Sequence, residues 1–324
     1  MSSTILHDGK PLSSHGYPRP FDKEFHGKPL EIYNGRPGLY SYKPEQVSSS
    51  LIEYIQHLHN PDEMETEQKE NHSQGLGLQQ WKSLESGEHK NLGIGELLRL
   101  YAKCFDLLFF GGLLKGFYRI SFLDSTIMPP FTWGQCCSGW KFKHGFEIEI
   151  RISNMRHIES FQVLDEPAQL RKLLGTLAHE MVHAVFQLYC CRTCDPCIVK
   201  ESRKVGPSGH SVLWQELAIS VEDTLNKCPL FTGGGAFDLN RSYSFFREFN
   251  GDEDCDCNVY LQDSLTQRQL GNLRLSARTN GKIEAQIRDR DFKRRQEARK
   301  KAKPSEAVVL KGRVSKANSI GPRH

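Results

Sequence analysis

The stretch TLAHEMVHAVF, residues 176–186, places two histidines and a glutamate in the order H-E-x-x-H within an apolar run. If this stretch is helical, His179 and His183 lie one turn apart on one face, with their Cβ atoms about 6 Å apart. Two imidazoles at that spacing can bind one Zn²⁺ ion at about 2.0–2.1 Å. Glu180 then points beside the metal, where its carboxylate can take a proton from a water molecule. The pattern predicts a catalytic zinc site with Glu180 as the general base.

The phase of the surrounding helix favours this interpretation over a chance match. One apolar stripe is predicted along the helix, formed by Leu170, Leu173, Leu174, Leu177, Met181, Ala184 and Leu188. His179 and His183 lie nearly opposite that stripe, beside the apolar Val182 and Phe186. A core packed around the helix does not explain two histidines on the far face, whereas a cleft does.

A catalytic zinc site usually has three protein ligands and one open position. The best third candidate is His210, which follows a glycine turn in GPSGHSVLW at the start of another predicted helix. Glu216 and Asp223 on that helix are the alternatives, because a glutamate on the following helix can also complete such a site. The longer pattern H-E-x-x-H-x-x-G-x-x-H is excluded, since residues 187–195 supply no glycine or histidine where it needs them.

The ten cysteines cluster instead of spreading evenly, which favours metal binding or reduced thiols over a disulfide framework. The densest group, in YCCRTCDPCIVK, consists of Cys190, Cys191, Cys194 and Cys197. Thiolates two residues apart suit a second, structural Zn²⁺ ion, but the regular spacing supplies only three of them. The fourth ligand is then Cys190 or one of Cys228, Cys136, Cys137, Cys255 and Cys257. The alternatives are free thiols or a disulfide in an exposed loop, and an iron–sulfur cluster fits this spacing less well.

The elements that must position these residues follow from hydrophobic periodicity. We expect a helix at 48–59, a helix from 95 to the Gly-Gly pair at 111–112, strands at 117–124, 131–142 and 145–153, and helices at 166–190 and 210–227. This order predicts an α+β fold with a small three-stranded antiparallel or mixed sheet packed with helices.

The flanks of this core differ in composition. Residues 1–90 are predicted to be largely disordered apart from the helix at 48–59, and 91–230 to form the α+β domain. The stretch 231–260 is expected to be a loop-rich extension with a short strand at 243–249. Residues 261–324 are expected to be a basic tail that is helix-prone or disordered.

Charge is distributed unevenly along the 324 residues. Residues 268–324 hold 17 Lys and Arg against 5 Asp and Glu, a net +12, whereas the preceding residues carry −8, which gives the overall +4. A basic tail on an acidic body predicts a nucleic-acid partner, the alternative being a solvated tail or a nuclear-import signal. No apolar run approaches the length of a membrane span, and the first twenty residues resemble no secretory signal. We therefore expect no membrane partner and a nuclear or cytoplasmic location, not secretion; nothing indicates the oligomeric state.

Four stretches together resemble the SprT-like metallopeptidase domain family. They are LYAKCFDLLFFGGLL (100–114), CCSGW (136–140), LLGTLAHEMVHAVF (173–186) and GHSVLWQELA (209–218), within about 91–228. The family's functional set falls here on His179, Glu180, His183 and His210. The resemblance implies a zincin-like fold with H-E-x-x-H on its central helix, and zinc-dependent cleavage of proteins, including DNA-bound or DNA-crosslinked ones.

The resemblance stops at the protease domain. The chain shows no ubiquitin-binding zinc finger, no sliding-clamp motif and no paired C-x-x-C zinc ribbon after it. The main alternative is a DNA- or chromatin-binding module that keeps a structural zinc and cleaves little. A non-proteolytic zinc hydrolase is a third interpretation.

Overall fold

The computed structural model describes residues 6–7, 10–11, 28–30, 32, 39–59, 72–89, 91–129, 132–141, 145–155, 158–191, 208–228, 231, 236–250 and 265–302. Its strands are β1 Leu6–His7, β2 Lys10–Pro11, β3 Tyr118–Leu123, β4 Gly134–Lys141 and β5 Gly145–Ser153. Its helices are α1 Pro44–Gln56, η1 His57–His59, α3 His72–Glu85, α4 Ile94–Phe110, α5 Glu159–Gln162, α6 Glu166–Tyr189, α8 Val212–Lys227, α9 Arg241–Asn250, α11 Gln267–Asn272 and α12 Ala277–Ala302. The helices and strands expected between 95 and 227 are all present, with ends shifted by a few residues.

The central sheet is small and mixed. Its strand order is β3-β5-β4, with β3 parallel and β4 antiparallel to β5. Along β5, Ile148, Ile150 and Ile152 are buried, while Glu149 and Arg151 alternate with them on the other face. This period of two gives the sheet one apolar face for the helices. The predicted α+β class with a three-stranded sheet is confirmed, and the sheet is mixed rather than antiparallel.

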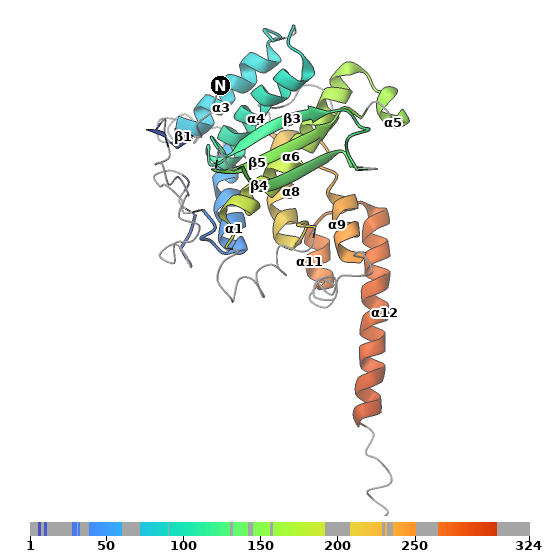
Figure 1. Cartoon of the computed structure of the whole chain (residues 1–324). Helices are drawn as coiled ribbons and strands as arrows, with labels where there is room; N and C mark the ends of the chain where they lie inside the picture. The colour runs from blue at the N-terminus through green and yellow to red at the C-terminus, as the bar shows by residue number, and fades with distance from the viewer. Residues whose placement is uncertain are drawn as a thin grey trace, which may run out of the picture.

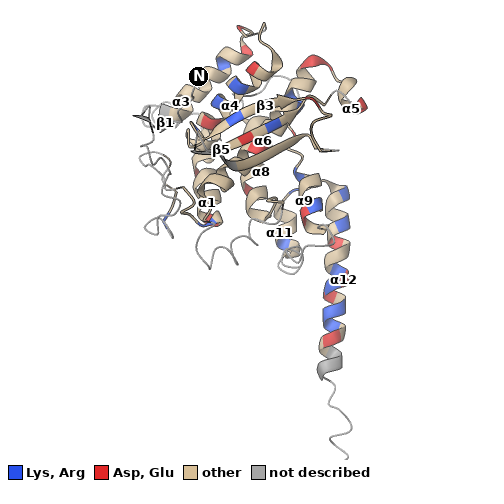
Figure 2. Ribbon diagram, in the orientation of Figure 1, with Lys and Arg blue, Asp and Glu red and all other residues tan. Residues whose placement is uncertain are grey.

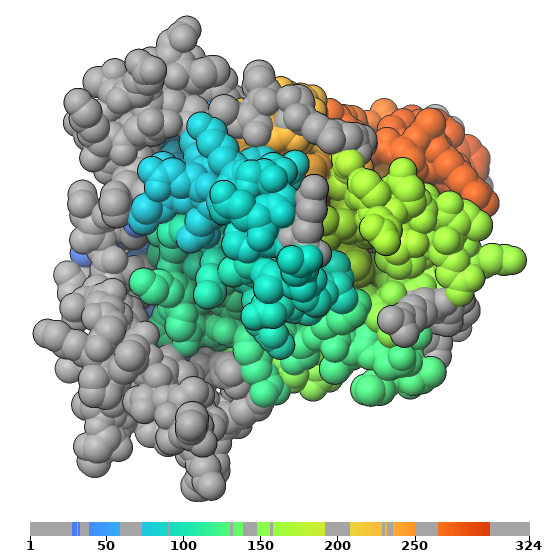
Figure 3. Space-filling view, turned by 90° about the horizontal axis from the view of Figure 1, so that it is seen from above, coloured from blue at the N-terminus to red at the C-terminus, as the bar shows by residue number. Residues whose placement is uncertain are grey.

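Helices α4 and α6 pack against the apolar face of the sheet, and α8 packs on α6 (Figure 1). Helix α6 is buried almost continuously from Leu173 to Tyr189. Seen from above, the surface of α3 and α4 lies beside that of α5 and α6 (Figure 3). Helix α6 therefore packs against the sheet, α4 and α8, which fix the positions of its buried residues.

The N-terminal region contains more structure than the sequence indicated. Helix α1 packs on α8 through a face that includes Val47, Leu51 and Ile55, all fully buried. Helix α3 packs on α4, and its Trp81 contacts the ring of Phe231 at 4.9 Å between centroids. Disorder was expected here because residues 1–90 are rich in Gly, Pro, Ser, His and charge, but Leu78, Trp81 and Leu84 of α3 are buried in the core.

The region after the core forms a second, smaller apolar cluster. Its buried members are Phe245, Phe249, Leu265, Leu270, Leu273, Leu275, Ile283 and Ile287, from α9, α11, α12 and the connections between them. The short strand expected at 243–249 is wrong, because this stretch is the helix α9. Phe245 and Phe249 lie four residues apart and so face the same side of that helix, toward α12.

Helix α12 packs on the body through Ile283 and Ile287, and its C-terminal part projects away from it (Figure 1). Lys and Arg are frequent along this projecting part (Figure 2). Among the described helices, none combines the length and apolarity needed to cross a membrane.

Candidate metal centre

Helix α6 presents the two motif histidines from its buried middle. The helix begins at Glu166 behind Asp165, whose side chain accepts a hydrogen bond from the Ala168 backbone N–H at 2.9 Å, a normal N-cap. Thirteen residues further on, His179 is 8% exposed, and its ring contacts that of Trp214 at 4.5 Å between centroids. His183 stacks on the same indole at 5.2 Å with an interplanar angle of 28°. Trp214 thus forms the base on which the motif histidines lie.

His210 reaches the same point from the start of α8. Gly209, just before it, has φ +81°, and a Cβ there would lie 3.1 Å from His183 Nδ1. A glycine is therefore needed for both the backbone conformation and the space beside His183. The turn places His210 Nε2 2.9 Å from both His179 Nε2 and His183 Nε2.

The three Nε2 atoms converge at a spacing suited to a metal ion. The remaining pair, His179 and His183, is separated by 3.2 Å. Ligand nitrogens around a tetrahedral zinc ion lie about 3.3 Å apart, given bonds of about 2.05 Å. Among the described residues, these three histidines form the group of His, Cys, Asp and Glu side chains that can hold a metal ion.

The protonation of the rings supports a cation at this point. His179 Nδ1 lies 2.7 Å from the Leu239 carbonyl oxygen, so Nδ1 must carry the proton and donate it. Burial lowers the pKa of His179 to about 4 and the pKa values of His183 and His210 well below their usual range. With Nδ1 protonated, the neutral ring of His179 points an Nε2 lone pair at the Nε2 atoms of the other two rings, and a cation between the three nitrogens would make that arrangement favourable.

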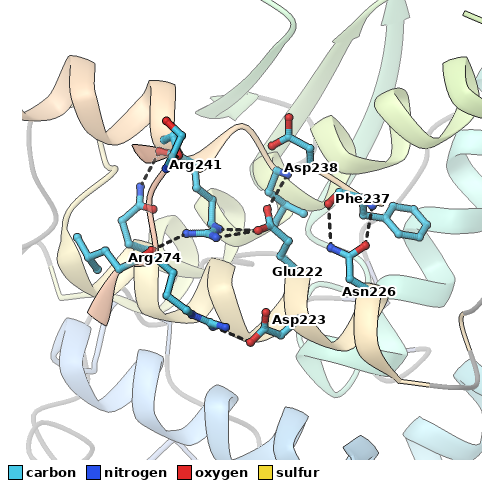
Figure 4. A network of polar contacts seen from close by, with 12 residues as sticks. Glu222, Asp223, Asn226, Phe237, Asp238, Arg241 and Arg274 are labelled. Atoms are coloured by element: carbon cyan, nitrogen blue, oxygen red, sulfur yellow. Dashed lines mark hydrogen bonds and ion pairs between the residues drawn. The ribbon is translucent and has the colours of Figure 1, made fainter. Parts of the chain in front are cut away.

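The Leu239 carbonyl is held in place by helix α8. The Leu239 N–H donates to Glu222 Oε2 at 2.9 Å, and Arg241 Nη2 donates to Glu222 Oε1 at 2.7 Å. One turn along α8, Asn226 donates to the Phe237 carbonyl at 2.9 Å and accepts from its N–H at 2.7 Å (Figure 4). The segment 236–240 therefore has a fixed backbone that sets the tautomer of His179.

Glu180 lies beside the histidines and does not join them. Its Oε1 is 4.0 Å from His179 Nε2, and its carboxyl accepts a hydrogen bond from the Cys136 N–H of β4. Desolvation raises the pKa of Glu180 to about 8, against the lowering effect of that hydrogen bond. The side chain fits because residue 134 is glycine: a Cβ there would lie 2.6 Å from Glu180 Oε1.

A half-open cleft of about 360 Å³ lies over these residues. One wall includes Trp133, Gly134 and Gln135, at and just before the start of β4, and the opposite wall includes Tyr243 and Arg247 from α9. In the described part of the chain, β4 pairs with β5 alone, so its other edge borders this cleft. The arrangement is a histidine cluster that could hold a metal ion, with a carboxyl group beside it, open to a ligand from one side.

The other predicted site residues fall in different places. Glu216, an alternative third ligand, is exposed on α8, and Asp223 forms ion pairs with Arg274 and Lys227 at 2.6 and 3.1 Å. Both lie outside the histidine cluster. Cys190 and Cys191 are buried at the end of α6, whereas Cys194 and Cys197 lie outside the described residues. A second metal at the cysteines therefore remains a prediction.

Several residues of the site were missed by sequence reasoning. The Leu239 carbonyl is a backbone group, which leaves no signature in the sequence. Tyr243 and Arg247 were assigned to a strand, and the buried Glu248 of the same helix was not singled out. The one sequence feature that could have indicated Glu248 is its place directly beside Phe249 in a short amphipathic stretch.

No family model matches the chain, and comparison with curated proteins and with solved structures gave no match.

Proposed function

We propose that this protein is a zinc-dependent metallopeptidase of the SprT-like, zincin type. The observation that carries the proposal is the convergence of three Nε2 atoms, 2.9–3.2 Å apart, with a buried glutamate beside them in an open cleft. A purely structural site has no need of Glu180 at this position. A catalytic site needs a glutamate at this position, because proton transfer requires a base close to the bound water.

Zinc is the metal that the donor set favours. Three neutral imidazoles are borderline-soft nitrogen ligands, and three protein ligands leave one position open, as in catalytic zinc sites. The lowered pKa values keep the rings unprotonated at neutral pH. The hydrogen bond of His179 to the Leu239 carbonyl supplies the outer contact that metal-binding histidines usually have.

A zinc ion held by His179, His183 and His210 would supply a Lewis acid that polarises a peptide carbonyl and makes water more acidic. Glu180 accepts the proton of the attacking water and then delivers it to the leaving amine. Burial raises the pKa of Glu180 to about 8 in the metal-free site, and a nearby zinc ion would lower it toward neutrality, where both protonation states are accessible. The Cys136 N–H orients the carboxyl group toward the cluster.

The cleft suits an extended polypeptide. The edge of β4 at Gly134 borders the cleft and would offer backbone groups to one side of a substrate, as in β-strand addition. At Cys136 the N–H and carbonyl of this edge are already bonded to Glu180 and Gln187. Tyr243 is 51% exposed on the opposite wall, where its ring and the Arg247 guanidinium can contact substrate side chains or carbonyls. The cleft is half open, which fits an endopeptidase better than an enzyme for a small enclosed ligand.

The basic helix α12 supports nucleic acid as the partner that brings protein substrates near. It carries ten Lys and Arg against four Asp and Glu. Substrates would then be DNA-bound proteins, including those crosslinked to DNA. The helix also favours the second candidate function, a DNA- or chromatin-binding module with a structural zinc.

The decisive test compares Glu180→Gln with Glu216→Gln. Glu180→Gln should keep the zinc of the wild type and lose cleavage of an unfolded protein substrate by about 10²–10⁴-fold, the usual contribution of a general base. Glu216→Gln changes the same chemical group on an exposed face of α8 and should keep both. Zinc per chain and cleavage rate, with and without duplex DNA, are the measurements.

The outcomes separate the two functions. Undiminished cleavage by Glu180→Gln removes Glu180 from the mechanism. A wild type that holds zinc and binds DNA but cleaves nothing is the binding module. A wild type without zinc contradicts the proposal altogether.

A further inference from the structure

We propose that Ser208 and Glu248 form a positioning pair that fixes His210 in its metal-binding orientation. The inference rests on the proposed metal site and assigns it two residues outside the H-E-x-x-H motif. Glu248 lies on α9, beyond the boundary at 230 that the sequence suggested for the domain.

The pair forms a continuous chain of contacts behind the ring. His210 Nδ1 lies 2.8 Å from Ser208 Oγ, and Ser208 Oγ in turn makes a short hydrogen bond to Glu248 Oε2. The same Oε2 accepts from the Ser208 N–H at 3.1 Å and from the His210 N–H at 3.4 Å. Glu248 thus holds the turn at 208–210 by its backbone and the ring of His210 through the serine hydroxyl.

The direction of these hydrogen bonds follows from the groups themselves. A carboxylate only accepts, so the Ser208 hydroxyl donates its proton to Glu248. The serine oxygen is then the acceptor for an Nδ1–H of His210. This selects the tautomer with an unprotonated Nε2, the atom that lies 2.9 Å from the other two histidines. The pair does for His210 what the Leu239 carbonyl does for His179.

The burial of Glu248 indicates that the contact has a purpose beyond packing. Its side chain is 0% exposed, and in the described part of the chain its Oε1 has no hydrogen-bond partner. A buried carboxylate with an unsatisfied oxygen destabilises a fold, whereas the oxygen of a glutamine could accept the same three hydrogen bonds without the charge. A cation bound by Nε2 of His210 would offset that cost, because Glu248 Oε2 lies 3.9 Å from Nδ1 of the same ring. Carboxylate–histidine contacts of this kind orient metal ligands in many zinc sites.

The packing of α9 makes the position rigid. Phe245 and Phe249, on either side of Glu248 along the helix, are buried in the second apolar cluster. The Arg241 guanidinium ties the start of the helix to Glu222 and to the Leu273 carbonyl. The carboxylate therefore has a fixed place from which it can hold His210.

The test measures zinc affinity by competition with a chelator, in the full chain, for wild type, Glu248→Gln, Ser208→Ala and Asn250→Ala. Glu248→Gln loses the negative charge behind the ring, and Ser208→Ala loses the hydroxyl that contacts His210 Nδ1. We expect each to weaken zinc binding by about 10–100-fold, the usual effect of altering an outer partner of a ligand. Asn250→Ala also removes hydrogen bonds of α9, to Phe246 and Gln286, and should bind zinc like the wild type.

A second readout excludes a merely structural role. The stability of each variant is measured by urea unfolding without zinc and at saturating zinc. A positioning role reduces the gain in stability on adding zinc in both variants. In Glu248→Gln it also leaves the metal-free stability unchanged or higher, since a buried charge is gone. A structural role lowers both stabilities equally. Ser208 is exposed, so Ser208→Ala folds even if Glu248→Gln does not, and it then decides the question.

The failures are distinguishable. If the wild type itself binds no zinc, the proposed function fails. If the wild type binds zinc tightly and Ser208→Ala binds it within about twofold of that affinity, only the positioning pair is overturned.

Discussion

Among the single residues of the site, Gly134 has the least room for change. A Cβ there would lie 2.6 Å from Glu180 Oε1, 2.8 Å from Glu180 Cγ and 2.7 Å from Thr176 Cγ2. We expect Gly134→Ala to push the Glu180 carboxyl out of place and lower the cleavage rate by about 10²-fold, because small displacements of catalytic groups cost that much. Zinc content should stay at the wild-type level, since the histidines are held from α6, α8 and the segment 236–240.

The matched control is Gly281→Ala, on α12, where an added Cβ meets nothing within 4 Å. Both variants are assayed for zinc per chain and for kcat/KM on the same protein substrate. Wild-type cleavage by Gly134→Ala would mean that Glu180 works from a position other than the one beside Gly134.

At the residue scale, the sequence predicted the side chains that make up the cluster and missed those that orient it. The helical period places His179, Glu180 and His183 together without knowledge of the fold. His210 could be proposed because a glycine turn before a helix is visible in the sequence. The Leu239 carbonyl and the Ser208–Glu248 pair could not, because they depend on a long-range approach of the chain that no local pattern records.

At the scale of elements, the end of helix α4 contains a buried carboxyl group that couples stability to pH. Asp106 is 3% exposed, and its Oδ1 accepts from the Leu114 N–H at 3.0 Å. Desolvation raises the pKa of Asp106 to about 7, above the value of about 3.9 in an unfolded chain. Between about pH 4 and pH 7, Asp106 is therefore protonated in the folded state and ionised in the unfolded state.

The sign of the effect follows from that difference. The contribution of Asp106 to stability is fully present below about pH 4 and is lost as the pH rises to about 7, by up to about 4 kcal/mol. Asp106→Asn keeps an acceptor for Leu114 and carries no charge at any pH. We expect the stability of this variant relative to the wild type to rise from pH 4 to pH 7 and then to level off, measured by urea unfolding across that range.

Asp289→Asn, at an exposed carboxylate of α12, controls for the loss of a charge. Its stability relative to the wild type should change little over the same range. If the difference in unfolding free energy between Asp106→Asn and the wild type stayed constant from pH 4 to pH 8, the raised pKa of Asp106 would be contradicted.

Helices and strands were predictable where their own sequence contains the apolar pattern of the face that they bury. The alternation in β5 and the apolar face of α6 are local patterns, and both elements lie within a residue of their predicted ends. Helix α9 was mistaken for a strand because YSFFREF fits both periods. The helix is favoured because this stretch packs on the apolar surface of α12, formed by Ile283 and Ile287, which lie more than thirty residues further along the sequence.

At the scale of the whole molecule, the charge asymmetry becomes a spatial one. The basic α12 packs on α9, which also lines one wall of the cleft. Helix α12 is about 39 Å long, at about 1.5 Å per residue, and its C-terminal part projects from the body (Figure 2). Nucleic acid along this projecting helix would be connected to the cleft through one short helix, α9.

The salt dependence of DNA binding tests this arrangement. For duplex DNA, the slope of log K against log salt falls by about 0.9 for each phosphate that the protein no longer neutralises. Replacing Arg288, Arg294 and Arg295 of α12 by Gln should therefore reduce the slope by about 2–3 and weaken binding at low salt.

Replacing Arg99, Lys103 and Lys115 by Gln removes the same charge from exposed positions on and just after α4 and should leave the slope unchanged. Equal reductions in the two triple variants would show that net charge alone drives binding. A wild type with no salt-dependent affinity would remove nucleic acid from the proposed function and leave a metallopeptidase whose substrates reach the cleft unaided.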